Sequence, residues 1–245
     1  MSWLTTLEGA WHLDGAVSHF NRALDVLERG GHQVDAARSL CEALNGIRAE
    51  WSRFAGQEEM SEVETFQAML AQALYSDAQA ELLSSDEVAE LLALEPGAVP
   101  HGEASRAHVL QRLAELSPIS RPNAEAIPLQ LLLVNLLLDK PGERLVIYGT
   151  LAPGKANHSV IEDLSGQYCD CSVNGRVSEV DGLPYFTWTP SGDSLDAQLF
   201  SSKQLPEKWD DLDRFEGAGY KRRLIPATTD GGLSVASIYL STADD

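Results

Sequence analysis

The chain of 245 residues has few cysteines, few basic residues and no long hydrophobic run. Three cysteines are too few for the disulfide framework that stabilises small secreted domains. The most apolar stretch, residues 127–138, is shorter than the roughly 20 residues that a membrane-spanning helix needs. Residues 1–10 have neither a basic end nor an apolar centre, so they do not predict a signal peptide. We therefore expect a cytoplasmic protein that does not associate with a membrane.

Basic residues are outnumbered, because 18 lysines and arginines stand against 37 aspartates and glutamates. The resulting formal net charge is −19 at pH 7, and the acidity is spread over both halves of the chain. Neither half has the basic surface that a phosphate backbone requires, so we expect no nucleic-acid partner. The six histidines show no metal-ligand spacing, and Cys169 and Cys171 have no histidine near them in sequence. We expect no bound metal.

Residues 1–142 have the apolar periodicity of helices nearly throughout. Helices are expected at about residues 17–27, 35–51, 61–74, 85–92, 105–116 and 123–139. Asp35 is expected to cap the second of them. This pattern predicts an all-α bundle of unknown role, without a recognisable chemical motif. Lys140-Pro141-Gly142 is typical of a boundary, which divides the chain into residues 1–142 and 143–245.

Residues 143–245 change to short β-rich runs separated by glycine-containing turns. Strands are expected at residues 145–148, 168–173, 175–180, 185–188, 195–200, 221–227 and 233–240. A single helix is expected near residues 205–216. Many short strands with one helix predict a small mixed β-barrel, so the whole chain is expected to be an α+β protein.

One carboxylate, Glu216, stands between that helix and a turn that contains glycine. Apolar residues three or four apart fall on one face of the helix: Leu205, Trp209, Leu212 and Phe215. Pro206 suits the first helical turn, and Gly217 suits the end of the helix. A carboxyl group at a helix C-terminus meets partial negative charge, which favours its protonated form. Part burial would raise its pKa toward neutrality, as proton transfer at pH 7 requires.

A second motif, Tyr148-Gly149-Thr150-Leu151, follows the apolar run at residues 145–147. A glycine at a strand end lets backbone N–H groups approach a ligand closely, because no Cβ stands in the way. Such N–H groups can hold a carboxylate or a developing oxyanion. Thr150 is not expected to be a nucleophile, because no Ser/His/Asp arrangement accompanies it.

Together the two motifs resemble those of the γ-glutamylcyclotransferase, or AIG2-like, family. Its members carry a Tyr-Gly-Ser/Thr-Leu loop after the first strand and, later in the chain, Leu-Asp-x-x-Glu-Gly-x-x-Tyr-x-Arg. The second pattern is matched here by Leu212, Asp213, Glu216, Gly217, Tyr220 and Arg222. The Gly-Tyr-Pro of many members is replaced by Gly182-Leu183-Pro184. The resemblance covers residues 143–240 and implies the small barrel of that family.

The resemblance also implies a reaction, the cyclisation of a γ-glutamyl amide to 5-oxoproline with release of an amine. In this reading Glu216 is the general acid and base, and Tyr148, Gly149, Thr150, Leu151 and Tyr220 bind the substrate. No cofactor is implied. Arg222 is expected to form a structural ion pair with a neighbouring aspartate, and Asp213 to be a surface residue of the helix.

Two alternatives stay open at this point. The first is a non-catalytic binding or scaffolding protein, in which the barrel keeps its fold and the helical domain binds a partner. The second keeps the chemistry but removes a γ-glutamyl protecting group from a biosynthetic intermediate. The helical domain is also a candidate surface for a homodimer. An open cavity that joins Glu216 to residues 148–151 would favour an enzyme.

Overall fold

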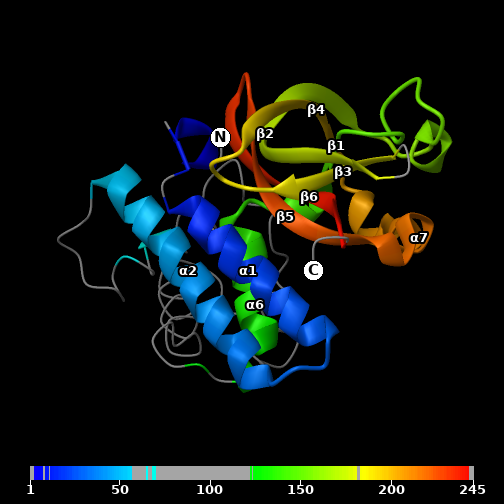
Figure 1. The fold of residues 1–245 in the computed structure, drawn as a ribbon. Helices are drawn as coiled ribbons and strands as arrows, with labels where there is room; N and C mark the ends of the chain where they lie inside the picture. Colours follow the sequence, from blue (N-terminus) through cyan, green and yellow to red (C-terminus); the bar gives the residue numbers. More distant parts are fainter. Residues whose placement is uncertain are drawn as a thin grey trace, which may run out of the picture. The chain divides into compact units, whose positions relative to one another are not determined.

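The computed structural model describes residues 3–7, 9–10, 12–56, 65, 68–69, 122, 124–180 and 183–242. The chain divides into two compact units (Figure 1). One contains Met1–Trp3 and Trp11–Asp139, and the other contains Leu4–Ala10 and Lys140–Asp245. The segment Leu4–Ala10, which the sequence assigned to the helical domain, thus groups with the C-terminal unit. The helices expected at 61–74, 85–92 and 105–116 lie outside the described residues, except for positions 65, 68 and 69.

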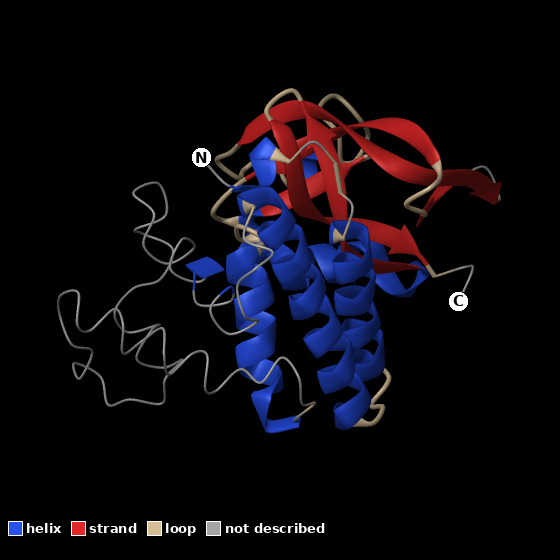
Figure 2. Cartoon of the chain, turned by 90° about the vertical axis from the view of Figure 1, so that its left-hand side faces the viewer, coloured by secondary structure: helices blue, strands red, loops and turns tan. Residues whose placement is uncertain are grey.

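Three long helices form the described part of the first unit: α1 (Leu13–Glu28), α2 (Gln33–Ala55) and α6 (Ile127–Leu137). They lie side by side in both views (Figures 1 and 2), at the places where the sequence predicts helices. Gly46 allows α2 to approach α1 closely, because a Cβ there would lie 2.9 Å from the Ala16 Cβ. Asp35 does not cap α2 as predicted: the helix begins after His32, and Asp35 pairs with Arg38 instead.

Six strands build the second unit: β1 (Arg144–Ile147), β2 (Gln167–Val180), β3 (Leu183–Trp188), β4 (Asp193–Ser201), β5 (Tyr220–Thr229) and β6 (Gly232–Ser241). Their order is β3-β2-β4-β1-β6-β5, and an additional β2–β5 pairing closes the sheet, with β3 outside the ring. The β1–β6 pairing is parallel and the others are antiparallel. Figure 2 shows the strands curving round one another. The predicted mixed β-barrel after N-terminal helices is confirmed.

The strand β2 corrects one sequence prediction. Residues 168–173 and 175–180 were expected to be separate strands joined by a turn at Asn174-Gly175, but β2 passes straight through both. Gly175 serves a different purpose, because a Cβ there would collide with the ring of Phe186 on β3. Glycine in a strand often marks such a close approach, and the sequence pattern does not distinguish it from a turn.

Glu216 is the last residue of helix α7 (Leu205–Glu216), so the packing of this helix decides where Glu216 lies. Leu205, Trp209 and Leu212 are buried in a cluster with Phe200 of β4 and with residues of β1, of the segment that follows β1 and of β6. The Trp209 indole N–H donates to the carbonyl of Gly142 over 3.0 Å. Phe215 was expected on the same buried face, but its side chain is 43% exposed. Burial of the other three residues is therefore sufficient to hold the helix against the barrel.

No described helix has both the length and the apolar character needed to cross a bilayer. The three cysteines are free thiols, of which Cys41 and Cys171 are buried and Cys169 is exposed.

Candidate active site

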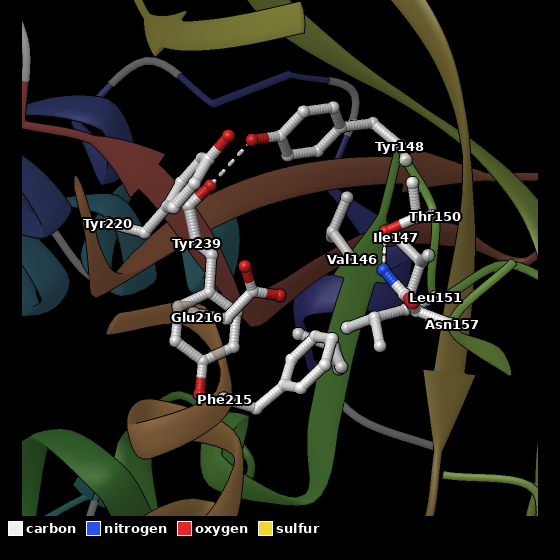
Figure 3. A pocket seen from close by; sticks show the side chains of 12 residues that line it. Val146, Ile147, Tyr148, Thr150, Leu151, Asn157, Phe215, Glu216, Tyr220 and Tyr239 are labelled. Atoms are coloured by element: carbon white, nitrogen blue, oxygen red, sulfur yellow. Dashed lines mark hydrogen bonds between the residues drawn. The ribbon is translucent and has the colours of Figure 1, made fainter. Parts of the chain in front are cut away.

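A cavity of about 260 Å³ lies in the barrel unit, between the end of β1 and the end of α7 (Figure 3). Its wall is formed by residues of β1, the loop that follows β1, α7, β5 and β6. They are Leu145, Val146, Ile147, Tyr148, Gly149, Thr150, Leu151, Asn157, Phe215, Glu216, Tyr220 and Tyr239. All six site residues predicted from the sequence, Tyr148, Gly149, Thr150, Leu151, Glu216 and Tyr220, line this single cavity.

The loop of residues 148–151 presents hydrogen-bond donors rather than acceptors. The carbonyl of Gly149 accepts from the Ala152 N–H, and the carbonyl of Thr150 accepts from the Asn157 N–H. The carbonyl of Leu151 accepts from Nδ1 of His158 over 3.0 Å. Among the described residues, by contrast, the backbone N–H groups of positions 149–151 have no acceptor. Free N–H groups on a tight loop are suited to bind an anionic oxygen.

Glu216 is the last residue of α7 and is half-buried. Figure 3 shows its carboxylate directed into the cavity, across from Thr150 and Asn157. Burial raises the pKa of Glu216, because a desolvated carboxylate is disfavoured relative to the neutral acid. Among the described residues that line the cavity, it is the only acidic or basic side chain apart from the tyrosines. The arrangement suits a carboxyl group that both accepts and releases a proton.

The direction of Glu216 depends on the next residue, Gly217, which has φ 70° and ψ −171°. This combination is open to glycine and costs other residues about 1 to 3 kcal/mol. Within the part of the chain that the structure describes, no atom lies within 4 Å of a Cβ built on Gly217, so strain rather than collision would penalise a side chain there. We expect Gly217→Ala to lower the free energy of unfolding by about 1 to 3 kcal/mol. Chemical denaturation followed by circular dichroism measures this, and an unchanged midpoint would contradict it.

Two tyrosines of the cavity are held in fixed positions. The Tyr148 hydroxyl donates to the backbone carbonyl of Tyr239 over 2.9 Å, as the dashed line in Figure 3 shows. Burial, followed by the proximity of Tyr220 and Glu216, raises the pKa of Tyr148, so its hydroxyl stays neutral. The ring of Tyr220 stacks on that of Tyr185, with centroids 5.7 Å apart and planes 5° apart. The Tyr148 hydroxyl is therefore already used as a donor, and both rings act as walls.

Behind the cavity, Asp213 is hydrogen-bonded by both Arg222 and Tyr239. Arg222 binds its carboxylate through two bonds of 3.0 Å, and the Tyr239 hydroxyl donates over 2.6 Å. The guanidinium also lies 4.5 Å from the centre of the Trp209 ring. The predicted ion pair of Arg222 with an aspartate is thus confirmed. Asp213 does more than occupy the helix surface, because it connects α7 to β5 and β6.

The pKa of Asp213 is lowered. Burial alone would raise it, but the hydrogen bonds from Arg222 and Tyr239 and the positive charges of Arg222 and Arg223 together outweigh burial. A carboxyl group with a lowered folded pKa stabilises the fold above its unfolded pKa, and loses that contribution as the pH falls. We expect Asp213→Asn to cost up to about 1 kcal/mol at pH 7, because the pair is partly exposed. Denaturation at pH 7 and pH 3 should show a smaller difference at pH 3 than at pH 7, and a difference of the same size at both pH values would contradict this.

The sequence did not identify Asn157, Phe215 and Tyr239 as parts of the site. Asn157 belongs to a turn-rich segment without periodicity, and Tyr239 reads as one more apolar position of a strand. The side chains of Leu183 and Pro184 lie outside the described part of the structure, as does Gly182. Within the described residues, no group of three or more His, Cys, Asp or Glu side chains is placed to share a metal ion.

Comparison with known proteins locates the similarity in the barrel unit. Residues 145–245 match the family model "Gamma-glutamyl cyclotransferase, AIG2-like", which confirms the resemblance for the C-terminal part of the chain. Comparison with curated proteins gives no match.

Several solved structures are similar to the chain over two fifths of its length. YkqA from Bacillus subtilis is 22% identical with a TM-score of 0.35, over 41% of this chain and 36% of that protein. An uncharacterized protein from Pyrococcus horikoshii is 23% identical with a TM-score of 0.31, over 41% of this chain and 78% of that protein. An AIG2-like protein from Mus musculus is 16% identical with a TM-score of 0.34, over 41% of this chain and 77% of that protein. This chain thus spans little more than a third of the length of YkqA.

Proposed function

We propose that the protein is a γ-glutamylcyclotransferase-type enzyme, which converts a γ-glutamyl amide to 5-oxoproline and releases an amine. The observation that carries the proposal is the shared cavity of Glu216 and residues 148–151. A proton-transferring carboxylate faces a loop of free N–H groups across a space large enough for a small ligand. The match of residues 145–245 to the family model supports the same chemistry.

In the proposed reaction the α-amine of the substrate attacks its own γ-carbonyl carbon. Attacking and attacked groups belong to one molecule, so the site must mainly orient them. Glu216 accepts a proton from the α-ammonium, which frees the lone pair for attack. A new C–N bond closes the ring, the old amide C–N bond breaks, and Glu216 returns a proton to the departing nitrogen. Overall, the departing nitrogen gains the two protons that the α-nitrogen loses.

The loop of residues 148–151 has a separate task in this proposal. Its free N–H groups bind the negatively charged oxygen atoms of the substrate, which are those of the α-carboxylate and of the carbonyl during attack. Tyr148 and Tyr220 form the walls that limit the conformations of the glutamyl chain. Residues of the chain carry every step, and no cofactor takes part.

The test uses the full chain with a panel of γ-glutamyl amines and γ-glutamyl dipeptides, and detects 5-oxoproline by mass spectrometry. The same substrates with an acetylated α-amine serve as controls, because a blocked amine cannot close the ring. We expect 5-oxoproline from at least one free-amine substrate and none from its acetylated counterpart. Absence of 5-oxoproline throughout the panel would refute the proposal, and amine release from acetylated substrates would indicate hydrolysis instead.

The same panel addresses the alternatives that the sequence left open. A scaffolding protein is expected to turn over none of the substrates. If the protein removes a γ-glutamyl protecting group from a biosynthetic intermediate, turnover should depend strongly on the size and identity of the amine. The open cavity beside Glu216 supports an enzyme over a scaffold, because a scaffold has no need of one.

A further inference from the structure

The hydroxyl oxygen of Thr150 already accepts a hydrogen bond from the side chain of Asn157. The side-chain amide of Asn157 donates through Nδ2 to Thr150 Oγ1 over 2.9 Å. Figure 3 shows this bond on the wall of the cavity opposite Glu216. Because the Thr150 oxygen accepts from Asn157, its own hydrogen must be donated elsewhere. Among the described residues the Thr150 hydroxyl has no acceptor.

Asn157 also holds the backbone of the same residue. Its N–H donates to the Thr150 carbonyl over 3.0 Å, and the neighbouring His158 ring binds the carbonyl of Leu151. A carbonyl oxygen can only accept, so His158 Nδ1 carries the hydrogen in this contact. Asn157 and His158 therefore hold the loop of residues 148–151 in place. They also occupy the carbonyl oxygens of Thr150 and Leu151, so these two acceptors are not available to a ligand. Thr150 and the loop residues Gly149 and Leu151 line the same cavity.

From this geometry we propose that Asn157 directs the Thr150 hydroxyl, and that the hydroxyl donates to the α-carboxylate of the ligand. Asn157 is a positioning residue in this proposal and does not touch the ligand. No Lys, Arg or His side chain is among the described residues that line the cavity, so neutral donors provide the recognition of the carboxylate in this proposal. The inference rests on the proposed function for the identity of the ligand.

The experiment measures binding and not turnover, so its result is independent of catalysis. The ligand is 5-oxoproline, and pyrrolidin-2-one is the matched compound that lacks only the carboxylate. Affinities are obtained by NMR titration of the full chain. We expect wild type to prefer 5-oxoproline over pyrrolidin-2-one, because the donors of the loop meet the carboxylate only in the former.

Substitutions at Thr150 test the donor itself. Thr150→Val has nearly the same shape but no hydroxyl, and it should weaken 5-oxoproline binding about 10- to 100-fold. Binding of pyrrolidin-2-one should not change. Thr150→Ser retains the donor and should stay within about threefold of wild type. Thermal unfolding of each variant checks that the fold is intact.

Substitutions at Asn157 test the direction of the hydroxyl. In Asn157→Asp a carboxylate replaces the amide, so it accepts the Thr150 hydrogen and leaves only lone pairs toward the ligand. This variant should lose at least as much 5-oxoproline affinity as Thr150→Val. The control is Asn174→Asp, which also removes an amide donor and adds the same charge, but on an exposed part of β2. Asn174→Asp should bind as wild type does.

A double-mutant cycle separates positioning from a direct contact. If Asn157 acts through Thr150, Asn157→Ala adds little further loss when Thr150 is already Val. Equal binding by wild type, Thr150→Val and Asn157→Asp would overturn the inference, and so would failure of wild type to bind 5-oxoproline. Absence of turnover with normal binding would instead refute only the proposed function.

Discussion

Replacement of Glu216 by Gln should reduce the formation of 5-oxoproline by about 10²- to 10⁴-fold, the usual contribution of a general acid and base. Gln has almost the same shape but can neither accept nor return the proton. The half-buried position at the end of α7 should be kept, because the helix is held by Leu205, Trp209 and Leu212 instead. Steady-state kinetics on the best substrate of the panel measures the effect as a loss in kcat.

The same substitution should make the fold more stable at neutral pH. Burial raises the pKa of Glu216, so the folded state favours the protonated form. That stabilising contribution is complete below the unfolded pKa of about 4.3, and is lost as the pH rises through the folded value. Gln stays neutral at every pH, so Glu216→Gln should unfold at higher denaturant concentration than wild type at pH 7 and above. The two proteins should become equal near pH 3.

The matched control for both measurements is Glu207→Gln. Glu207 is exposed in the first turn of the same helix and does not line the cavity. This variant should retain full activity and gain no stability, since a negative charge near a helix N-terminus is slightly favourable. Full activity of Glu216→Gln, or a loss of its stability at pH 7, would contradict the role proposed for Glu216.

A valine at Gly149 should lower kcat/KM by about 10²-fold, the order of loss that follows a displacement of the substrate by 1 Å. No atom of the described residues lies within 4 Å of a Cβ built on Gly149, and the φ of Gly149 is not in the left-handed region. The described part of the protein therefore has room for a side chain there, and Gly149 itself lines the cavity, so we expect the added side chain to take up space that the substrate needs. The free energy of unfolding should change by less than about 1 kcal/mol.

Gly231→Val provides the comparison for this prediction. Gly231 is exposed in the turn between β5 and β6, has only an ordinary contact near its Cβ position, and lies outside the cavity wall. The Gly231→Val variant should therefore have the same kcat/KM as wild type. A Gly149→Val enzyme with wild-type kinetics would show that the loop backbone is not in contact with the substrate.

Local sequence patterns were sufficient for several parts of the site. Pro206 in the first turn of α7, Gly217 after its last residue and the spacing of Leu205, Trp209 and Leu212 are short-range signals, and they located Glu216 at the helix end. The apolar run that ends at Ile147 likewise located the loop of residues 148–151. In both cases the determining interactions lie within one or two turns of chain, where sequence spacing and spatial distance correspond.

Other parts depended on contacts between distant segments. The passage of β2 through Asn174-Gly175 follows from the fit of Phe186 beside Gly175, which the order of residues does not reveal. Phe215 shares the helical spacing of the buried residues, yet it lines the cavity, because the cluster around Trp209 occupies only part of the apolar face. Asn157 carries no periodic signal at all, and its connection to the loop appears only from its bonds to Thr150.

The sequence by itself predicted the described N-terminal helices and the barrel of the fold, and it named six of the residues that line the cavity. Only the tertiary structure decided that the loop after β1 and the end of α7 face each other across one cavity. That juxtaposition results from burial of Leu145, Phe200 and Trp209 in a common cluster, together with the β2–β5 pairing that closes the barrel. Burial and strand closure act between residues far apart in the chain, so spacing along the sequence cannot specify them.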